Sequence, residues 1–155
     1  MFGVCRYYSK DYTEAEDVLH EGFIKVFKKI NQFEGKGVFE GWLRRVFVNT
    51  ALERYRKQNI LYPVEDYHQF VELADNYNAV EQITTKDLYA IIQELSPKYK
   101  MVFNLYAIEG YQHKEIAEML GISEGTSKSN LARARTILQK KVKERFSSID
   151  QSISL

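Results

Sequence analysis

Apolar residues recur through most of the chain at three- and four-residue intervals, the spacing of one face of an α-helix. This pattern predicts helices over about 15–30, 39–57, 85–95 and 97–108. Ser96-Pro97 marks the start of the last of these, because a proline in the first turn of a helix loses no hydrogen bond. No segment alternates apolar and polar residues for long enough to predict a sheet, so the expected fold class is all-α.

The segment from Gly110 to Arg135 has the pattern of a helix-turn-helix. Ile116 and Leu120 belong to an apolar stripe on the first helix. Gly121 can adopt the positive φ that ends a helix tightly, and Ser123 is a favourable N-cap for the second helix. A turn this short projects the second helix outward, where it can fit a DNA major groove.

The second helix of this motif carries side chains that can form hydrogen bonds with DNA. We expect them to face away from the apolar positions Leu131, Ala134 and Leu138. They are Thr126, Lys128, Ser129, Asn130 and Arg133. A helical hairpin used only for packing would not require polar residues at these positions.

Taken together, the pattern predicts two small helical domains joined by a linker. The stretch between them has no regular spacing of apolar residues, contains Pro63 and is acidic, which is typical of a linker. The expected organisation is a helical domain over 1–60, a linker over 61–83, a helix-turn-helix domain over 84–146 and a flexible tail over 147–155.

Charge is unevenly distributed, although the net charge is only +1. Between residues 63 and 95, seven acidic residues stand against one lysine, whereas between 113 and 145 eight basic residues stand against four acidic ones. A basic C-terminal segment can attract phosphates. The same charges would also suit an ordinary solvated helix face.

Residues that commonly carry catalysis or bind metals are few and scattered. The histidines His20, His68 and His113 lie in different segments, at spacings that match no metal site. No nucleophile elbow, glycine-rich nucleotide loop or thiol–histidine motif is present. We therefore predict a protein that is not an enzyme and needs no metal or cofactor. The single cysteine, Cys5, cannot form an internal disulfide and is expected to be a small buried residue.

The sequence contains no recognisable targeting segment. It has no signal peptide and no apolar run long enough to cross a bilayer. The expected location is therefore the cytoplasm, without membrane insertion.

Three groups of residues, in this order along the chain, match a known family. The first group runs from Glu14 to Phe27 and the second from Phe33 to Ala51. The third joins Leu95-Ser96-Pro97 to the helix-turn-helix. With these motifs the chain resembles bacterial RNA polymerase sigma factors of the extracytoplasmic-function group, over about Met1 to Val142.

The resemblance implies a transcription initiation factor. Such a factor binds core RNA polymerase, recognises the minus-ten and minus-thirty-five promoter elements and assists DNA melting. The implied partners are core polymerase, double-stranded promoter DNA and the melted non-template strand. Members of the family often also have an anti-sigma factor.

The resemblance also implies roles for individual side chains. The residues expected to touch the polymerase are Asp17, His20, Glu21 and Lys25. In the region that opens the duplex, the expected DNA contacts are Lys36, Arg45, Asn49 and Arg56, with the Asn49 amide suited to a base edge. At the upstream element they are Lys114, Thr126, Lys128, Ser129, Asn130 and Arg133.

Aromatic residues of the first domain have an alternative role in packing. Phe23 and Phe27 can serve the core alone, and Trp42 fits a core position better than a platform for base stacking. The core face predicted for the helix over 39–57 contains Phe39, Leu43, Val46, Phe47 and Ala51.

Several positions depart from the family pattern. Ser127 stands where a branched apolar residue is usual, Asn130 where an arginine is common, and Gln112 where a capping serine or threonine is frequent. The chain also begins inside the first domain. We therefore expect either a truncated start or a helix that the domain can do without.

Two other functions are compatible with the residues alone. One is a helix-turn-helix regulator or recombinase-like DNA-binding module that does not use polymerase. The other is an interaction protein built from helical hairpins that binds no DNA. The segment from Ala15 to Lys57 favours the initiation factor, because a simple regulator needs neither its acidic start nor its aromatic helix.

Overall fold

The computed structural model describes residues 1–61 and 84–150, and every regular element within them is helical. The all-α prediction is therefore confirmed. The chain divides into two compact units, unit 1 over Met1–Asp66 and unit 2 over Tyr67–Leu155. The predicted linker over 61–83 lies, except for its first residue, outside the described residues.

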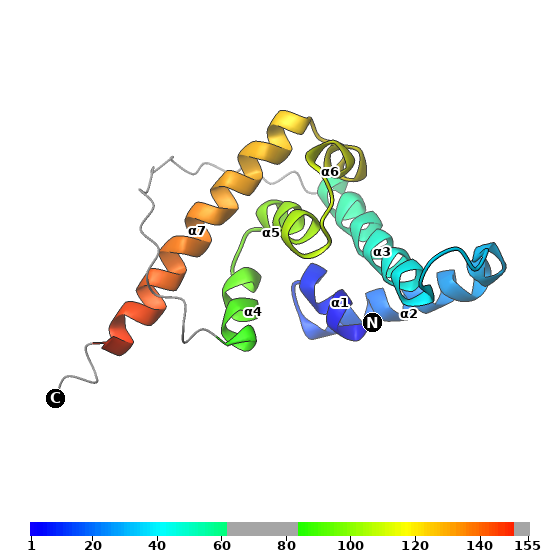
Figure 1. Cartoon of the computed structure of the whole chain (residues 1–155), viewed down its shortest axis with the longest axis horizontal. Coiled ribbons are helices and arrows are strands. Elements are labelled where there is room, and N and C mark those ends of the chain that lie inside the picture. The colour runs from blue at the N-terminus through cyan, green and yellow to red at the C-terminus, as the bar shows by residue number, and fades with distance from the viewer. Residues whose placement is uncertain (62–83, 151–155) are drawn as a thin grey trace. The chain divides into compact units, whose positions relative to one another are not determined.

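Unit 1 is built from three helices that all pack against one another, shown in blue to cyan in Figure 1. They are α1 (Phe2–Tyr8), α2 (Tyr12–Lys29) and α3 (Phe39–Leu61), with the short 3-10 helix η1 (Ile30–Gln32) after α2. The α2 helix begins three residues earlier than predicted, because the Asp11 carboxylate caps it. This carboxylate accepts a hydrogen bond from the Glu14 N–H over 2.8 Å.

Helices α2 and α3 approach each other closely at Gly22. The facing side chain is Phe47, whose ring is fully buried. A Cβ atom at position 22 would lie 2.3 Å from this ring, so the approach requires glycine. From α1, Cys5 is 1% exposed, and burial raises the pKa of its thiol to about 11. The prediction that Cys5 is buried is confirmed.

Unit 2 contains the remaining elements. They are α4 (Thr85–Gln93), α5 (Pro97–Phe103), the π-helical turn η2 (Asn104–Ile108), α6 (His113–Leu120) and α7 (Glu124–Asp150). Pro97 opens α5, as its sequence position predicts. The tail was expected to begin at residue 147, but α7 continues to Asp150. Residues 151–155 lie outside the described part of the chain.

Helices α6 and α7 pack together as a helix-turn-helix, so this prediction is also confirmed. Gly121 ends α6 with φ 69°, and Ser123 caps α7 by accepting a hydrogen bond from the Thr126 N–H over 3.0 Å. At the start of α6 the Glu115 carboxylate accepts from the Gln112 N–H over 2.7 Å, although a capping serine or threonine is absent there. The packed face of α7 includes Ala134, which lies in one core cluster with Leu95, Tyr99 and, at its edge, Ile137 and Leu138.

Candidate functional site

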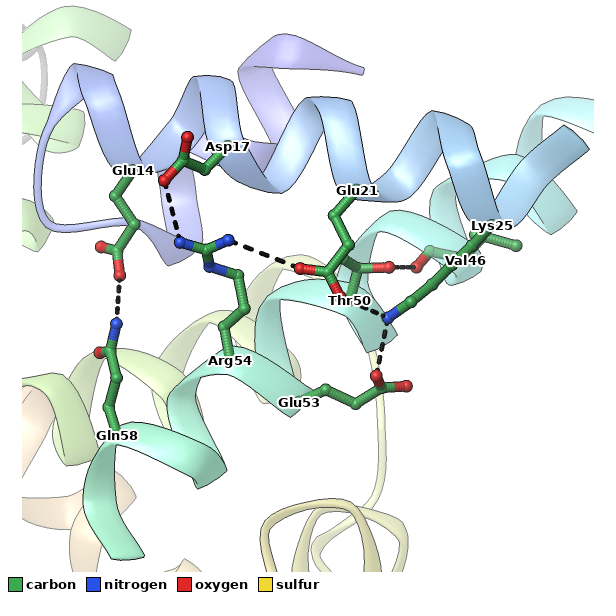
Figure 2. Close-up of polar contacts among 9 residues, drawn as sticks. All are labelled: Glu14, Asp17, Glu21, Lys25, Val46, Thr50, Glu53, Arg54 and Gln58. Atoms are coloured by element: carbon green, nitrogen blue, oxygen red, sulfur yellow. Dashed lines mark hydrogen bonds and ion pairs between the residues drawn. The ribbon is translucent and has the colours of Figure 1, made fainter. Parts of the chain in front are cut away.

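Polar side chains of α2 reach across to α3 in a row, as Figure 2 shows. Arg54 of α3 donates to Asp17 over 3.1 Å and to Glu21 over 3.5 Å. The Lys25 ammonium donates to Glu53 over 2.7 Å and lies 3.1 Å from the Glu21 carboxylate. Two acids and one lysine of α2 are thus linked to an arginine and an acid of α3.

This row, which we call the α2–α3 seam, consists of Glu14, Asp17, Glu21, Lys25, Glu53, Arg54 and Gln58. Gln58 completes it by donating to Glu14 over 2.9 Å. Partial burial alone would raise the pKa of Glu21, but hydrogen bonds and charge from Lys25 and Arg54 outweigh burial and lower it. Burial alone would lower the pKa of Lys25, but Glu53 and Glu21 raise it. Both shifts favour the charged form of the group.

The seam corrects the expectation that Glu21 and Lys25 are exposed, whereas their contact with polymerase stays a prediction. Their side chains are only 32% and 22% exposed, because their spacing places them on the side of α2 that faces α3. Asp17 is more exposed, at 55%, but it is paired with Arg54. His20 is exposed and lies outside the seam.

The exposed surface of α2, and of η1 directly after it, also carries apolar side chains. We call them the outer strip, which consists of Phe23, Ile24 and Phe27 of α2 and Ile30 of η1. Phe27 is 75% exposed and Ile24 is 54% exposed. By helical spacing His20 lies on the same side, four residues before Ile24. The alternative that Phe27 serves the core is therefore wrong, whereas Phe23 does contact the buried Phe47 edge-on, with ring centroids 5.2 Å apart.

An aromatic cluster lies between η1 and the first turn of α3. Phe33 and Phe39 meet edge-on with centroids 5.2 Å apart, and Phe39 stacks on Trp42 at 5.7 Å. Phe39 is 43% exposed, so its predicted place in the core is wrong. Trp42 is half-buried within the cluster. Val38, beside it in sequence, is 76% exposed.

The residues predicted to contact melted DNA lie on exposed parts of unit 1. Arg45, Asn49 and Arg56 are exposed and follow helical spacing along one side of α3. Lys36 precedes the helix and forms an exposed ion pair with Glu34 over 2.6 Å. Contact of these side chains with DNA stays a prediction.

In unit 2, the exposed start of α7 carries part of the predicted DNA-binding set. Lys114, Thr126 and Lys128 are exposed, and Ser129 is half-buried. The Lys128 ammonium lies 2.7 Å from the Glu124 carboxylate, and this hydrogen bond is the main cause that lowers the pKa of Glu124. A phosphate could therefore replace Glu124 as the partner of Lys128.

Asn130 was predicted to face DNA, and this is wrong. Its side chain is 7% exposed, because the helical repeat places it on the packed face, three residues after Ser127 and four before Ala134. Arg133 borders the same face. It is half-buried, and its guanidinium donates to the Tyr99 hydroxyl over 3.5 Å.

Residues 1–61 and 84–150 contain neither a metal-binding cluster nor a membrane-spanning helix. No group of three or more His, Cys, Asp or Glu side chains in these ranges is placed to hold a metal ion. None of the helices in these ranges combines the length and hydrophobicity needed to cross a bilayer. The candidate functional surfaces are accordingly the outer strip, the aromatic cluster, the exposed side of α3 and the start of α7.

Comparison with known families matches both units. Residues 1–60 match the family described as Sigma-70 region 2, and residues 85–138 match the family described as Sigma-70, region 4. The two matches coincide with the helices of unit 1 and with most of those of unit 2.

Individual relatives extend this similarity along the chain. The ECF RNA polymerase sigma-E factor of Haemophilus influenzae is 30% identical over 153 residues, which cover 90% of this chain and 79% of that protein. The ECF RNA polymerase sigma factor SigE of Mycolicibacterium smegmatis is 31% identical over 144 residues, and the match covers 90% of this chain but 56% of that protein.

A solved structure shares the fold. It is the sigma factor RpoE of Bartonella quintana in complex with the anti-sigma factor NepR. The TM-score is 0.58, over 92% of this chain and 89% of that chain. Because only 22% of the residues are identical, this likeness concerns the fold alone.

Proposed function

Because the chain belongs to the extracytoplasmic-function sigma factors of bacterial RNA polymerase, which are transcription initiation factors and not enzymes, we propose that it brings core polymerase to a bipartite promoter and helps to melt it. Unit 1 corresponds to sigma-70 region 2 and unit 2 to region 4. Membership of this family favours this proposal over both alternatives, the regulator without polymerase and the hairpin protein without DNA.

The outer strip of α2 carries the proposal for polymerase binding. It exposes phenylalanine and isoleucine side chains, while Asp17, Glu21 and Lys25 of the same helix are held in the seam. Burying one such apolar side chain in an interface contributes about 1.5–3 kcal/mol. We therefore assign core polymerase to the outer strip, with His20 at its side, instead of to Glu21 and Lys25.

The aromatic cluster and the exposed side of α3 support a role in DNA melting. Melted DNA presents unstacked bases, and stacking a base on an aromatic side chain contributes about 1–3 kcal/mol. Phe39 exposes part of its ring for such a contact. Arg45, Arg56 and Lys36 supply cations for the backbone of the non-template strand, and the Asn49 amide can donate to and accept from a base edge.

The exposed start of α7 supports recognition of the upstream promoter element in the major groove. Lys128 and Ser129 lie in its first two turns, and half-buried Arg133 lies one turn further. Lys114 and Thr126 are exposed, and we assign phosphate contacts to them. Asn130 has no part in this proposal because its side chain is buried.

Regulation by an anti-sigma factor is part of the same proposal. The Bartonella sigma factor with this fold was solved together with such an inhibitor. An inhibitor that covers the outer strip would block polymerase from the same residues. We expect the protein to act in the cytoplasm, where polymerase and promoter DNA are found.

Reconstitution with purified bacterial core polymerase tests the proposed function. We expect the full chain to co-elute with core polymerase in gel filtration and to start transcripts at fixed positions on promoters selected from a random library. A variant with Phe27→Asp, matched by Lys28→Ala as control, should fail in both assays. If the unaltered chain stays separate from core polymerase at micromolar concentrations, the proposal is wrong.

A further inference from the structure

Ser127 is a fully buried polar residue on the packed face of the recognition helix α7. Its hydroxyl shares a hydrogen bond with Nδ1 of His113 on α6, with 3.0 Å between the oxygen and the nitrogen and either atom able to donate. A buried hydroxyl without a partner is destabilising, so the bond accounts for a serine at this packed position. The position thus joins α6 to α7 by a directional contact.

His113 also contacts a third element. Its ring stacks on Tyr106 of η2, with centroids 4.8 Å apart and planes inclined by 23°. The Arg135 guanidinium of α7 lies over the Tyr106 ring, 5.5 Å from its centroid. The contacts therefore run from α7 through α6 and η2 and return to α7. We call these residues the α7 bracket: Ser127, His113, Tyr106 and Arg135.

The bracket encloses the part of α7 that carries the expected base contacts. Its two attachment points on α7, Ser127 and Arg135, are roughly 12 Å apart along the helix axis. Lys128, Ser129 and Arg133 lie between them. Apolar packing alone is non-directional, whereas a hydrogen bond and a stacked ring each prefer one geometry. The bracket can therefore set the rotation of α7 about its own axis.

We propose that His113 is a positioning residue for DNA recognition: through Ser127 and Tyr106 it sets the angle at which α7 presents Lys128, Ser129 and Arg133 to the major groove. This inference rests on the proposed function of unit 2. His113 acts through α7 in this scheme and does not itself select a base.

Binding of the full chain to a promoter duplex tests the inference. His113→Phe keeps an aromatic ring for Tyr106 but loses the hydrogen bond, and Ser127→Ala loses the bond from the other side. Each variant should bind the selected promoter about threefold to tenfold more weakly, as expected for one lost hydrogen bond. The double variant should be no weaker than the weaker single one. Glu118→Ala, an exposed change on α6, should bind like the unaltered chain.

A scrambled duplex provides the readout that separates positioning from general destabilisation. A rotated α7 loses specific contacts but keeps its charge, so the ratio of promoter to scrambled affinity should fall while scrambled binding stays constant. Circular dichroism melting confirms that each variant is folded at the assay temperature. The fluorescence of Trp42, the single tryptophan, reports unit 1 separately.

Three results of these binding assays would overturn the inference. If the unaltered chain binds the promoter and the variants show the same promoter-to-scrambled ratio, the inference is overturned and the proposed function stands. Independent losses that add in the double variant overturn it as well, because Ser127 and His113 would then not act together. If the unaltered chain fails to distinguish promoter from scrambled DNA, the proposed function of unit 2 and the inference both fail.

Discussion

Helix α2 of unit 1 and helix α7 of unit 2 expose different kinds of side chain. In unit 1, α2 places Asp17, Glu21 and Lys25 in the seam with α3 and leaves Phe27 exposed. In unit 2, α7 buries Leu131 and Ala134, together with two polar residues, and exposes Lys128. An exposed apolar surface suits a protein partner, whereas an exposed cationic one suits phosphates. Under the proposed function, the face of an amphipathic helix that is buried decides which class of partner the helix binds.

The largest expected effect comes from placing a charge on the outer strip. Phe27→Asp should weaken capture of core polymerase by about 30-fold or more, because a central aromatic contact in an interface is worth about 2 kcal/mol or more. The protein should remain folded, since Phe27 is 75% exposed. Biolayer interferometry with immobilised core polymerase measures the change. Equal affinity of this variant and the Lys28→Ala control would refute the assignment of polymerase to the outer strip.

The next effect concerns the close approach of α2 and α3. Gly22→Ala should lower the free energy of unfolding of unit 1 by about 1–3 kcal/mol, because the new methyl group overlaps the buried Phe47 ring. Better helix propensity offsets up to about 1 kcal/mol of this. Denaturation followed by Trp42 fluorescence measures the change in the free energy of unfolding.

Gly41→Ala is the matched control, since it lies in α3 and its Cβ would meet no atom within 4 Å. It should leave unit 1 equally stable or stabilise it slightly. If both glycine variants were equally stable, the packing of α2 against α3 would not require glycine at position 22.

In unit 2 the contrast between two neighbouring residues should separate DNA contact from packing. Lys128→Ala should weaken promoter binding about threefold to tenfold and reduce the salt dependence of binding by about one phosphate contact. Asn130→Ala should instead lower the stability of unit 2 by about 1 kcal/mol, because buried packing is lost, with no change in salt dependence. Fluorescence anisotropy across a salt series measures both. A lower salt dependence for Asn130→Ala would contradict its place in the packed face.

The smallest expected effect is the response of the seam to acid. The pKa of Glu21 is lowered in the folded chain from its ordinary value of 4.5, so its contribution to stability is complete above pH 4.5 and disappears as the pH falls through the folded value. Because the group is partly exposed, the loss should stay below about 1 kcal/mol. Trp42 denaturation curves at pH 6 and pH 3.5 should differ less for Glu21→Gln than for the unaltered chain. Identical pH dependence of the two proteins would exclude a stabilising role for Glu21.

Local chemistry in the sequence was sufficient to predict the main helices from α2 onward, but α1 (Phe2–Tyr8) was not predicted. Gly121, Ser123 and Pro97 act within one turn of themselves, so their effects on helix starts and ends depend on no distant residue. The helix-turn-helix and the all-α class followed from such signals. The π-helical turn after α5 and the extension of α7 to Asp150 were not predicted. No single capping residue encodes either of them.

The functional surfaces were harder to predict, because α2 is apolar on one side of its exposed part and charged on the side that faces α3. A rule that places apolar residues inside and charged ones outside therefore predicted Glu21 to be exposed and offered the core as an alternative place for Phe27. The ion pair of Glu21 with Arg54 joins residues 33 positions apart, which no local pattern reveals. For Asn130 the spacing was sufficient: its distances from Leu131 and Ala134 already place it on the buried face.

Because Cys5 is buried, the rate at which its thiol reacts reports how often unit 1 opens. A thiol that is 1% exposed and has a pKa of about 11 reacts with a maleimide or an oxidant only when the helices around it separate. Since no other cysteine is present in the chain, the labelling rate counts those openings without any engineered probe. Core polymerase added during labelling would slow the reaction to the extent that it keeps unit 1 closed.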